Sequence, residues 1–316
     1  MARYLIRQGL SMTVTLLVAM VLLFIVMQLN SDVFVAGKLG IFSTQEGTFV
    51  KKTEFQLNLP IDILFFKWIS KVISGRIFTT NATNISILPH LLSSLKGSAS
   101  VIVLAVLISL IITILLSLIS INTKSRKVDG LCRILAVLGL SIPEMTYYLS
   151  LYALLGSSYL GLSFLGQGYL LFKSKILNFV VLNSLVTLFL VFRLYGVSFR
   201  YLRSQMLTVM NQEFITAEKS RGLSAYRINF GSIVRNSYVA IIPCAGTMVV
   251  EAMSSLVILE GYLSRSGFFG GFLNAAKSRD SFLVMAYFIV TIAALYALNL
   301  FLDFLLSLTD PRVIYD

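Results

Sequence analysis

Six apolar runs, each long enough to cross a bilayer as a helix, constrain this chain more than any other feature of its sequence. A spanning helix needs about 20 apolar residues. The runs cover residues 9–29, 98–121, 131–155, 176–195, 238–259 and 282–308. Since lipid offers no partner for backbone N–H and C=O groups, such runs predict helices. We therefore expect an all-α integral membrane protein with six transmembrane helices, the third of them broken at Pro143.

The composition excludes the main soluble classes. Of the 316 residues, 57% are hydrophobic and only 13% are charged, about half the charged share of a soluble domain. These values exclude a soluble globular enzyme, a disordered chain and a fibrous protein. The net charge of +12 is of the kind seen in nucleic-acid-binding proteins. Here, however, the basic residues lie in short segments between apolar runs, which is how membrane proteins set their orientation.

The basic segments predict that both termini lie in the cytoplasm. Short loops rich in Lys and Arg stay on the cytoplasmic side, whereas segments longer than about 60 residues translocate largely regardless of charge. The predicted organisation is a first transmembrane helix at 1–30, an extracytoplasmic subdomain at 31–97, and a five-helix core at 98–316 with a cytoplasmic loop at 196–237. The basic residues assigned to the cytoplasm are Arg3, Arg7, Lys124, Arg126, Lys127, Arg133, Arg193, Arg200, Arg203, Lys219, Arg221, Arg227 and Arg235.

The chain lacks the residues that intrinsic catalysis or a resident metal would need. Cys132 and Cys244 lie inside apolar runs and are expected to be small buried residues. His90 is the single histidine, so neither a metal cage of ordinary spacing nor a Ser-His-Asp triad can be assembled. The glycines at 161–166 are followed by Gln167, where a phosphate-binding loop needs Lys. We expect no enzymatic activity, no metal and no cofactor.

The loop between the fourth and fifth runs carries a helix-turn-helix pattern. Asn211 is a suitable N-cap, and Glu213 complements the positive end of a helix expected over 212–221. Gly222 can adopt the left-handed conformation that ends a helix, and Leu223 can complete its hydrophobic contact.

A second helix is expected to follow at once, with Ser224 as its cap, and to run towards the fifth span. Two interpretations of the helix pair remain open at this stage. It is either an amphipathic pair that lies on the membrane surface or a docking element for a cytoplasmic partner.

Three acidic residues lie within predicted spans, where a charge costs a few kcal/mol unless it faces protein or water. Asp303 lies near the cytoplasmic end of the last span and is interpreted as structural. Glu144 and Glu251 either form hydrogen bonds between helices or line a cavity. Pro143 frees a backbone carbonyl, which is tolerated where a helix lines a cavity.

Soft and aromatic side chains surround these acids in the sequence. Met145, Tyr147, Tyr148 and Met248 are suited to the wall of a cavity, and ordinary helix packing is the alternative for each of them.

Several motifs, in order along nearly the whole chain, resemble those of one transporter family. The central motif is EFITAEKSRGL at 213–223, followed by Arg235 and Asn236. The others are RYLIR at 3–7, SIP at 141–143, Glu260 with Ser264 and Gly267, Arg279 with Asp280, Asn299 with Asp303, and DPR at 310–312. Together they resemble importer permeases of the ATP-binding-cassette type, specifically the first-type permease subunit of the di-/oligopeptide/nickel transport family.

Three positions depart from the usual pattern of that family. The family loop usually carries Glu-Ala-Ala six residues before its Gly, whereas this chain has Thr216-Ala217-Glu218. After the first span, the usual Pro-Gly-Asp is replaced by residues 30–32 (NSD), and a common Pro before Gly267 is Ser266. These changes affect the contacts with partner subunits and not the overall resemblance.

The resemblance implies partners, a location and roles for particular residues. The implied partners are a second permease subunit, two cytoplasmic ATPases that hydrolyse the ATP, an extracytoplasmic substrate-binding protein and the lipid bilayer of a bacterial cell membrane, with no nucleic acid. The residues implied in coupling to an ATPase are Glu213, Phe214, Ala217, Glu218, Arg221, Gly222 and Leu223. The candidates for the translocation path are Pro143, Glu144, Tyr148, Met248 and Glu251.

The expected function is that of a non-catalytic permease subunit that forms half of the path for imported peptides. One alternative is the same role for nickel or a metal–chelator complex. A second is an ion-coupled secondary transporter, which would show inverted repeats and paired charges in broken helices. A third is a membrane scaffold or sensor that transports nothing.

Overall fold

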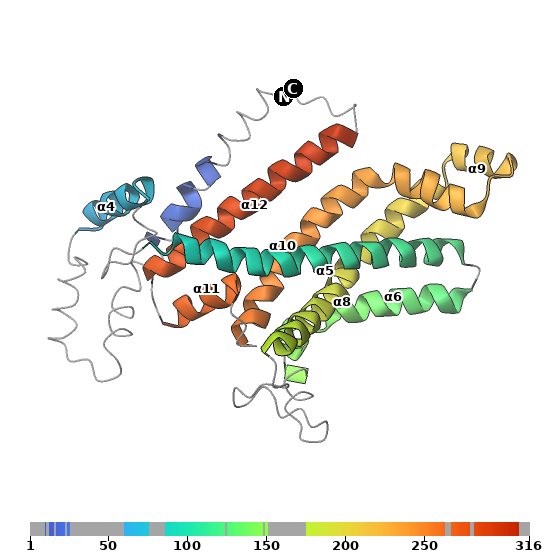
Figure 1. The fold of residues 1–316 in the computed structure, drawn as a ribbon. Helices are drawn as coiled ribbons and strands as arrows, with labels where there is room; N and C mark the ends of the chain where they lie inside the picture. The colour runs from blue at the N-terminus through green and yellow to red at the C-terminus, as the bar shows by residue number, and fades with distance from the viewer. Residues whose placement is uncertain are drawn as a thin grey trace, which may run out of the picture. The chain divides into compact units, whose positions relative to one another are not determined.

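The computed structural model of the protein is helical almost throughout its described part (Figure 1). The structure describes residues 10, 13–15, 17–22, 24–25, 60–75, 86–123, 125–147, 149–150, 175–262, 267–278 and 281–309. The helices are α4 (Ile61–Ile73), α5 (Leu88–Asn122), α6 (Arg126–Ser141), α8 (Lys175–Met210), α9 (Glu213–Ser220), the π-helix η3 (Arg227–Val234), α10 (Tyr238–Tyr262), α11 (Phe268–Lys277) and α12 (Ser281–Thr309).

Four of the described helices are long and apolar enough to cross a membrane. They are Leu88–Asn122, Asn183–Met210, Tyr238–Gly261 and Leu283–Leu308, which correspond to the second, fourth, fifth and sixth apolar runs. The prediction of an all-α membrane protein is therefore confirmed for the described residues. In the first run, residues 13–15, 17–22 and 24–25 are helical, and its remainder lies outside the described residues.

The helices extend further than the apolar runs that predicted them. Helix α5 begins at Leu88, ten residues before the predicted start, and α8 continues to Met210, well beyond residue 195. The reason is physical, because an apolar run marks only the part of a helix suited to lipid, whereas the hydrogen-bonded backbone continues through polar turns. Residues 88–97, the end of the predicted outer subdomain, are thus part of α5, and α4 lies in the described part of the segment before it.

The predicted break at Pro143 is confirmed. Helix α6 ends at Ser141, and Ile142 adopts an extended conformation with φ −77° and ψ 121°. Proline disfavours the helical conformation in the residue before it, which explains why the chain straightens there. A new turn follows at once, since the Thr146 N–H donates to the Pro143 carbonyl at 2.9 Å. Residues 151–155, the end of the predicted third span, lie outside the described residues.

The chain divides into two compact units. The first contains residues 1–96, 266–297 and 314–316, and the second contains residues 97–265 and 298–313. In the first unit, Met20, Phe24 and Met285 form a buried cluster. The Phe24 ring meets that of Phe65 from α4 edge-on at 5.3 Å. This contact joins the first apolar run to the helix that follows it in the sequence.

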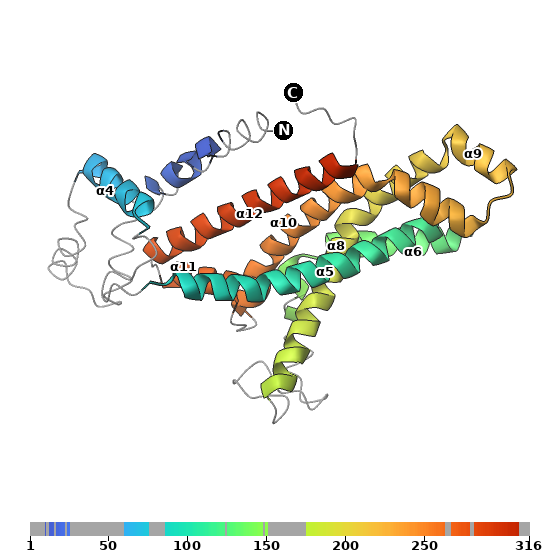
Figure 2. The same cartoon turned by 45° about the horizontal axis from the view of Figure 1, so that its top comes forward.

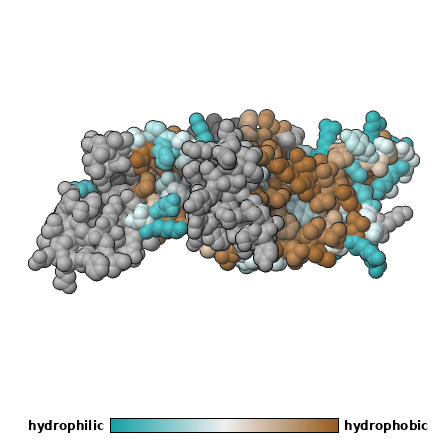
Figure 3. Space-filling model, turned by 60° about the horizontal axis from the view of Figure 1, so that its bottom comes forward, coloured by the Kyte–Doolittle hydropathy of each residue, from teal (hydrophilic) through white to brown (hydrophobic). Residues whose placement is uncertain are grey.

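The second unit buries small polar side chains and exposes large apolar ones. In α5, Ser109, Thr113 and Ser117 are fully buried, and the Thr113 and Ser198 hydroxyls lie 3.0 Å apart across the contact with α8. The outer surface is instead hydrophobic over a continuous region (Figure 3). That region ends at hydrophilic residues on the side where Figure 1 places α9. Helices that pack in lipid show this pattern, because small residues allow close approach and lipid covers the Leu and Ile side chains.

Helices α6 and α8 approach each other closely at two glycines. A Cβ atom on Gly196 would lie 2.7 Å from the Leu140 N atom and 2.8 Å from the Ala136 carbonyl oxygen, and one on Gly139 would lie 2.6 Å from the Phe192 carbonyl oxygen. These neighbours are backbone atoms and cannot move aside like a flexible side chain. The crossing of α6 and α8 therefore requires glycine at both positions.

We predict that Gly196→Ala lowers the thermal stability of the purified protein in detergent, because the added methyl group overpacks the crossing at a cost of about 1–3 kcal/mol. Gly130→Ala is the matched control, since a Cβ there meets nothing within 4 Å and Ala favours a helix by about 1 kcal/mol over Gly. Thermal unfolding should show a lower midpoint for Gly196→Ala alone. Equal midpoints for the two variants would contradict the close crossing.

Candidate functional site

The first candidate site is α9 with the chain on either side of it. In both views this segment lies at the end of the second unit, between the C-terminal end of α8 and the start of α10 (Figures 1 and 2). The residue before α9 is Gln212, with an extended backbone and no side-chain cap. The prediction of Asn211 as the N-cap is therefore wrong. Asn211 instead ends α8, because its N–H donates to the Leu207 carbonyl at 3.2 Å.

The end of α9 has the predicted geometry. Gly222 has φ +75°, in the left-handed region that favours glycine. Its N–H donates to the Lys219 carbonyl at 3.0 Å, and the Leu223 N–H donates to the Glu218 carbonyl at 3.3 Å. These two bonds form a Schellman motif, which satisfies carbonyls at the helix end and reverses the chain.

The second helix also begins where predicted, but it is wound differently. Ser224 Oγ accepts a hydrogen bond from the Arg227 N–H at 3.4 Å, which confirms Ser224 as the cap. From Arg227 to Val234 the helix has π geometry, which nothing in the sequence analysis indicated. π-Helical segments are rare and occur often at functional sites.

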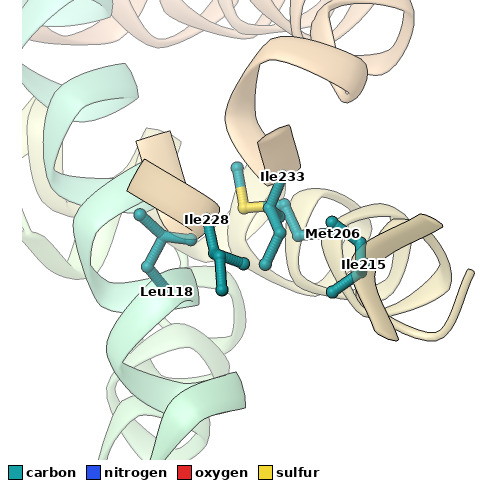
Figure 4. Close-up of a cluster of buried hydrophobic side chains, with 5 residues drawn as sticks. All are labelled: Leu118, Met206, Ile215, Ile228 and Ile233. Carbon is teal, nitrogen blue, oxygen red and sulfur yellow. The ribbon is translucent and has the colours of Figure 1, made fainter. Parts of the chain in front are cut away.

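A hydrophobic cluster holds α9 against the long helices. We call it the α9 cluster, and its buried members are Leu118 from α5, Met206 from α8, Ile215 from α9, and Ile228 and Ile233 from η3. Figure 4 shows these five side chains turned toward one another. Leu223 packs against the same cluster, which confirms its predicted hydrophobic contact. The position of α9 is thus set by packing against the ends of helices that are suited to span a membrane.

The two faces of α9 differ. Ile215 is fully buried, and Glu213, Phe214 and Ala217 are exposed, as is Arg221 just after the helix. This amphipathic arrangement leaves one face available to another molecule.

Glu218 lies on the inner side of the helix pair. Its Oε1 atom accepts a hydrogen bond from the Ser232 hydroxyl of η3 at 2.8 Å. The family resemblance implies a role for Glu218 in coupling to an ATPase, but Glu218 lies three positions after Ile215 and so near the same face of the helix. That spacing was the signal for an inward role.

The second candidate site is a charged cluster between α8, α10 and the turn after α6. Arg193 Nη2 donates to Glu251 Oε1 at 2.6 Å, and its Nε donates to the same oxygen at 3.1 Å. The Nη1 atom donates to the Leu140 carbonyl at 2.8 Å. Glu144 Oε1 lies 3.8 Å from the Arg193 Nε atom and accepts a hydrogen bond from Ser255 Oγ at 2.7 Å.

Arg193, predicted to be one of the cytoplasmic basic residues, lies midway along α8, inside a candidate span that also contains Arg200 and Arg203. The two acids therefore do form bonds between helices, as one of the two interpretations held. All three side chains also retain surface, with 18% of Arg193, 20% of Glu144 and 30% of Glu251 exposed. Two carboxylates and one guanidinium leave one excess negative charge.

The other candidates for the translocation path are not equally placed. Pro143 is exposed beside Glu144, whereas Met248 is fully buried, which favours the packing alternative for that side chain. Tyr147 is also buried and packs edge-on against the Phe189 ring at 5.4 Å. Tyr148 lies outside the described residues.

A second ion network lies at the ends of α5, α6 and α8 near α9. Arg203 Nε donates to Ser120 Oγ at 2.6 Å, and its Nη2 lies 3.1 Å from Asp129 Oδ1. Asp129 also pairs with Arg133 and accepts a hydrogen bond from Ser120. Burial alone would raise the pKa of Asp129, but the bond from Ser120 and the charges of Arg133 and Arg203 outweigh it and lower the pKa below its ordinary value. In the sequence these arginines indicate only orientation, because their partners Ser120 and Asp129 lie in other segments of the chain.

Comparison with known proteins gives a family match over most of the chain. Residues 113–315 match the model of the family described as "Binding-protein-dependent transport system inner membrane component". The matched region contains α6, α8, α9, η3, α10, α11 and α12, and so contains both candidate sites.

Individual relatives match at low identity but over full length. The chain is 25% identical to the oligopeptide transport system permease protein AppB of Bacillus subtilis, over 100% of both chains. It is 24% identical to the dipeptide transport system permease protein DppB of Lactococcus lactis, over 99% of both. It is 23% identical to the probable peptide ABC transporter permease protein y4tP of Sinorhizobium fredii, over 100% of both.

Proposed function

The chain belongs to the family of binding-protein-dependent transport system inner membrane components, and from this premise we propose that it is a permease subunit of an ATP-driven peptide importer. The observation that carries the proposal is the pairing of membrane-spanning helices with α9, a short helix that is anchored on one face and exposed on the other. The family match over residues 113–315 confirms, at the level of the family, the resemblance inferred from the sequence motifs.

Peptides are the cargo that the relatives favour. The three full-length relatives are named for oligopeptide, dipeptide and peptide transport. Nickel and metal–chelator complexes are not favoured by these names. Membership in a binding-protein-dependent family also argues against an ion-coupled secondary transporter and against a scaffold that transports nothing.

The chain would act in a complex and hydrolyse no ATP itself. Its proposed partners are a second permease subunit, two cytoplasmic ATPases and an extracytoplasmic substrate-binding protein. In this arrangement the ATPases supply the energy and the two permeases enclose the path. A peptide delivered from outside would cross when the helices change from an outward-facing to an inward-facing arrangement.

We propose α9 as the element that docks on one ATPase. Glu213, Phe214, Ala217 and Arg221 supply its exposed face, and the Schellman turn at Gly222 sets the direction in which that face points. Leu223 and the α9 cluster anchor the opposite face to α5 and α8. A helix held in this way can transmit a displacement of the ATPase instead of absorbing it.

We propose that the charged cluster lines the translocation path. Its support is the exposed part of Glu144 and Glu251, the helix break at Pro143, and the excess negative charge beside Arg193. Tyr148, which lies outside the described residues, belongs to this proposal through the sequence motif alone. Such a site would favour cargo with a positive group, such as the amino terminus of a peptide.

The proposed topology has six spans, with both termini in the cytoplasm and residues 31–97 outside the bacterial cell membrane. The segment that follows the end of α8 at Met210 would then place α9 on the side where ATP is available.

We predict that Gly222→Val uncouples the importer, because a β-branched residue in a left-handed conformation costs about 1–2 kcal/mol and displaces α9. Co-purification with the ATPases and ATP-driven peptide uptake by proteoliposomes should both fall, with membrane insertion unchanged. Gly222→Asn is the control, since Asn tolerates this conformation better, and it should stay close to the parent. Normal peptide uptake by Gly222→Val would contradict the docking role of α9.

We predict the orientation from cysteine labelling of intact cells. A cysteine at Ser43 or Thr80 should react with an impermeant thiol reagent added outside, and one at Ser125 or Ser224 only after permeabilisation. The natural Cys132 and Cys244 are buried, so their background should be low. The reverse pattern would overturn the orientation drawn from the basic loops.

We predict opposite effects of the two signs of charge in the charged cluster. Glu144→Gln and Glu251→Gln should lower the ratio of cationic to neutral peptide uptake, and Arg193→Gln should raise it. The expected change is about fivefold, since one charge at 4 Å in water contributes about 1 kcal/mol. Size-exclusion profiles check that each variant is folded. Unchanged ratios in all three folded variants would remove the cluster from the path.

A further inference from the structure

Glu218 makes its hydrogen bond inside the chain. Its Oε1 atom accepts from the Ser232 hydroxyl at 2.8 Å, and this bond joins α9 to η3, which follows it in the chain. The helical spacing explains the orientation, because Glu218 lies one turn after Ile215, which is fully buried in the α9 cluster. Glu218 therefore belongs to the anchored side of α9.

The position of Glu218 in the loop motif, which departs from the usual family pattern, decides on which face of α9 the acidic side chain lies. This chain carries Thr at position 216 and Glu at position 218, where the family usually has its Glu first. Two positions along an α-helix correspond to a rotation of about 200° around its axis. Thr216 is exposed and Glu218 is half-buried. In this chain the acidic side chain therefore lies on the anchored face of the helix, and position 216 lies on the exposed face.

Of the two carboxylate oxygens of Glu218, Oε1 alone accepts a hydrogen bond within the described residues. Its Oε2 atom is buried and has no hydrogen-bond partner within the part of the chain that the structure describes. A buried acceptor without a donor is costly, and more so when it is charged. The bond from Ser232 to Oε1 is therefore the contact through which this carboxylate joins α9 to η3 within the described residues.

On its other side, η3 is linked to α5. Asn122, the last residue of α5, donates from Nδ2 to Asn229 Oδ1 at 3.1 Å and to the Leu118 carbonyl at 2.8 Å. Leu118 is itself a member of the α9 cluster, where it faces Ile228 of η3 (Figure 4). The polar bonds and the hydrophobic cluster thus connect the same three elements: α9, η3 and α5.

We propose that Glu218 is a positioning residue that passes the displacement of α9 through Ser232 to η3, and through the Asn229–Asn122 bond to α5, and that it does not contact the ATPase. This inference rests on the proposed function of α9. In it, the α9 cluster is the rigid part of the connection, and the Glu218–Ser232 bond sets the register between the two helices. The π-helical winding of η3 lies between the two bonds.

The test compares two measurements on the reconstituted complex of both permeases, the ATPases and the binding protein. One is the affinity of the ATPase for the permease pair, and the other is the number of ATP molecules hydrolysed per peptide imported. Glu218→Ala and Ser232→Ala should leave the affinity unchanged and raise the ATP cost per peptide at least about fivefold, the lower end of usual coupling effects. Glu218→Gln keeps an acceptor for Ser232 and should restore the parent value.

Two controls separate this role from general damage to the protein. Ser220→Ala lies on the same helix, and the Ser220 hydroxyl is bonded to the Thr216 carbonyl of α9 itself, so this variant should behave like the parent. Asn229→Ala combined with Ser232→Ala should be no worse than either change alone, because residues in one chain of contacts are not additive. Additive effects would show that the connection does not continue to α5.

Other outcomes would overturn the proposal. A loss of ATPase affinity in Glu218→Ala, with Ser232→Ala unaffected, would make Glu218 a direct contact to the ATPase. An unchanged ATP cost in both alanine variants would remove the bond from coupling. The absence of ATP-dependent uptake in the parent complex would instead refute the proposed function, so the two failures are distinguishable.

Discussion

The absence of water in the hydrocarbon part of a bilayer is the constraint on which this structure depends. Each polar group within a span needs a partner from the protein. The backbone meets this need by forming long helices, and side chains such as those of Arg193 and Thr113 meet it by pairing between helices. Arg193 contacts Glu251, Glu144 and the Leu140 carbonyl, and Thr113 contacts Ser198. The same polar contacts that make charged residues tolerable also fix how the helices of the second unit pack.

The long helices continue beyond the apolar runs that are suited to cross the membrane. Since α8 continues to Met210, its last turns bring Met206 beside Leu118 of α5, and together these residues bury Ile215 of α9. The Arg203–Asp129 network joins the ends of α5, α6 and α8 in the same region. A short helix of eight residues is too short to be stable alone in water. It is stable here because Ile215 is buried against Leu118 of α5 and Met206 of α8. A partner that displaces α9 must therefore also displace the ends of these helices.

The two candidate sites share one design. In each, an acidic side chain is bonded within the chain to a residue of another helix. The charged cluster has one more carboxylate than it has guanidinium groups, and Glu218 has one oxygen without a donor among the described residues. A transporter must alternate between conformations, and contacts that are strong enough to define one state but not to trap it suit that task. The fully buried apolar contacts, such as those of the α9 cluster, supply the parts that stay together.

The sequence by itself determined the features that depend on neighbours along the chain. Apolar runs predicted helices, Pro143 predicted a break, Gly222 predicted a left-handed turn, and the ordered motifs indicated the family. It could not determine which side chains meet across the fold. Arg193 and Glu251 are 58 residues apart, and no pattern in the sequence marks the π winding of η3. For Glu218 both kinds of information are needed. Helical spacing indicates the face of α9 on which it lies, but only the tertiary structure placed Ser232 opposite it. The physical reason is that backbone preferences act over one or two turns, whereas pairing of charges and packing of side chains are decided when distant segments come together.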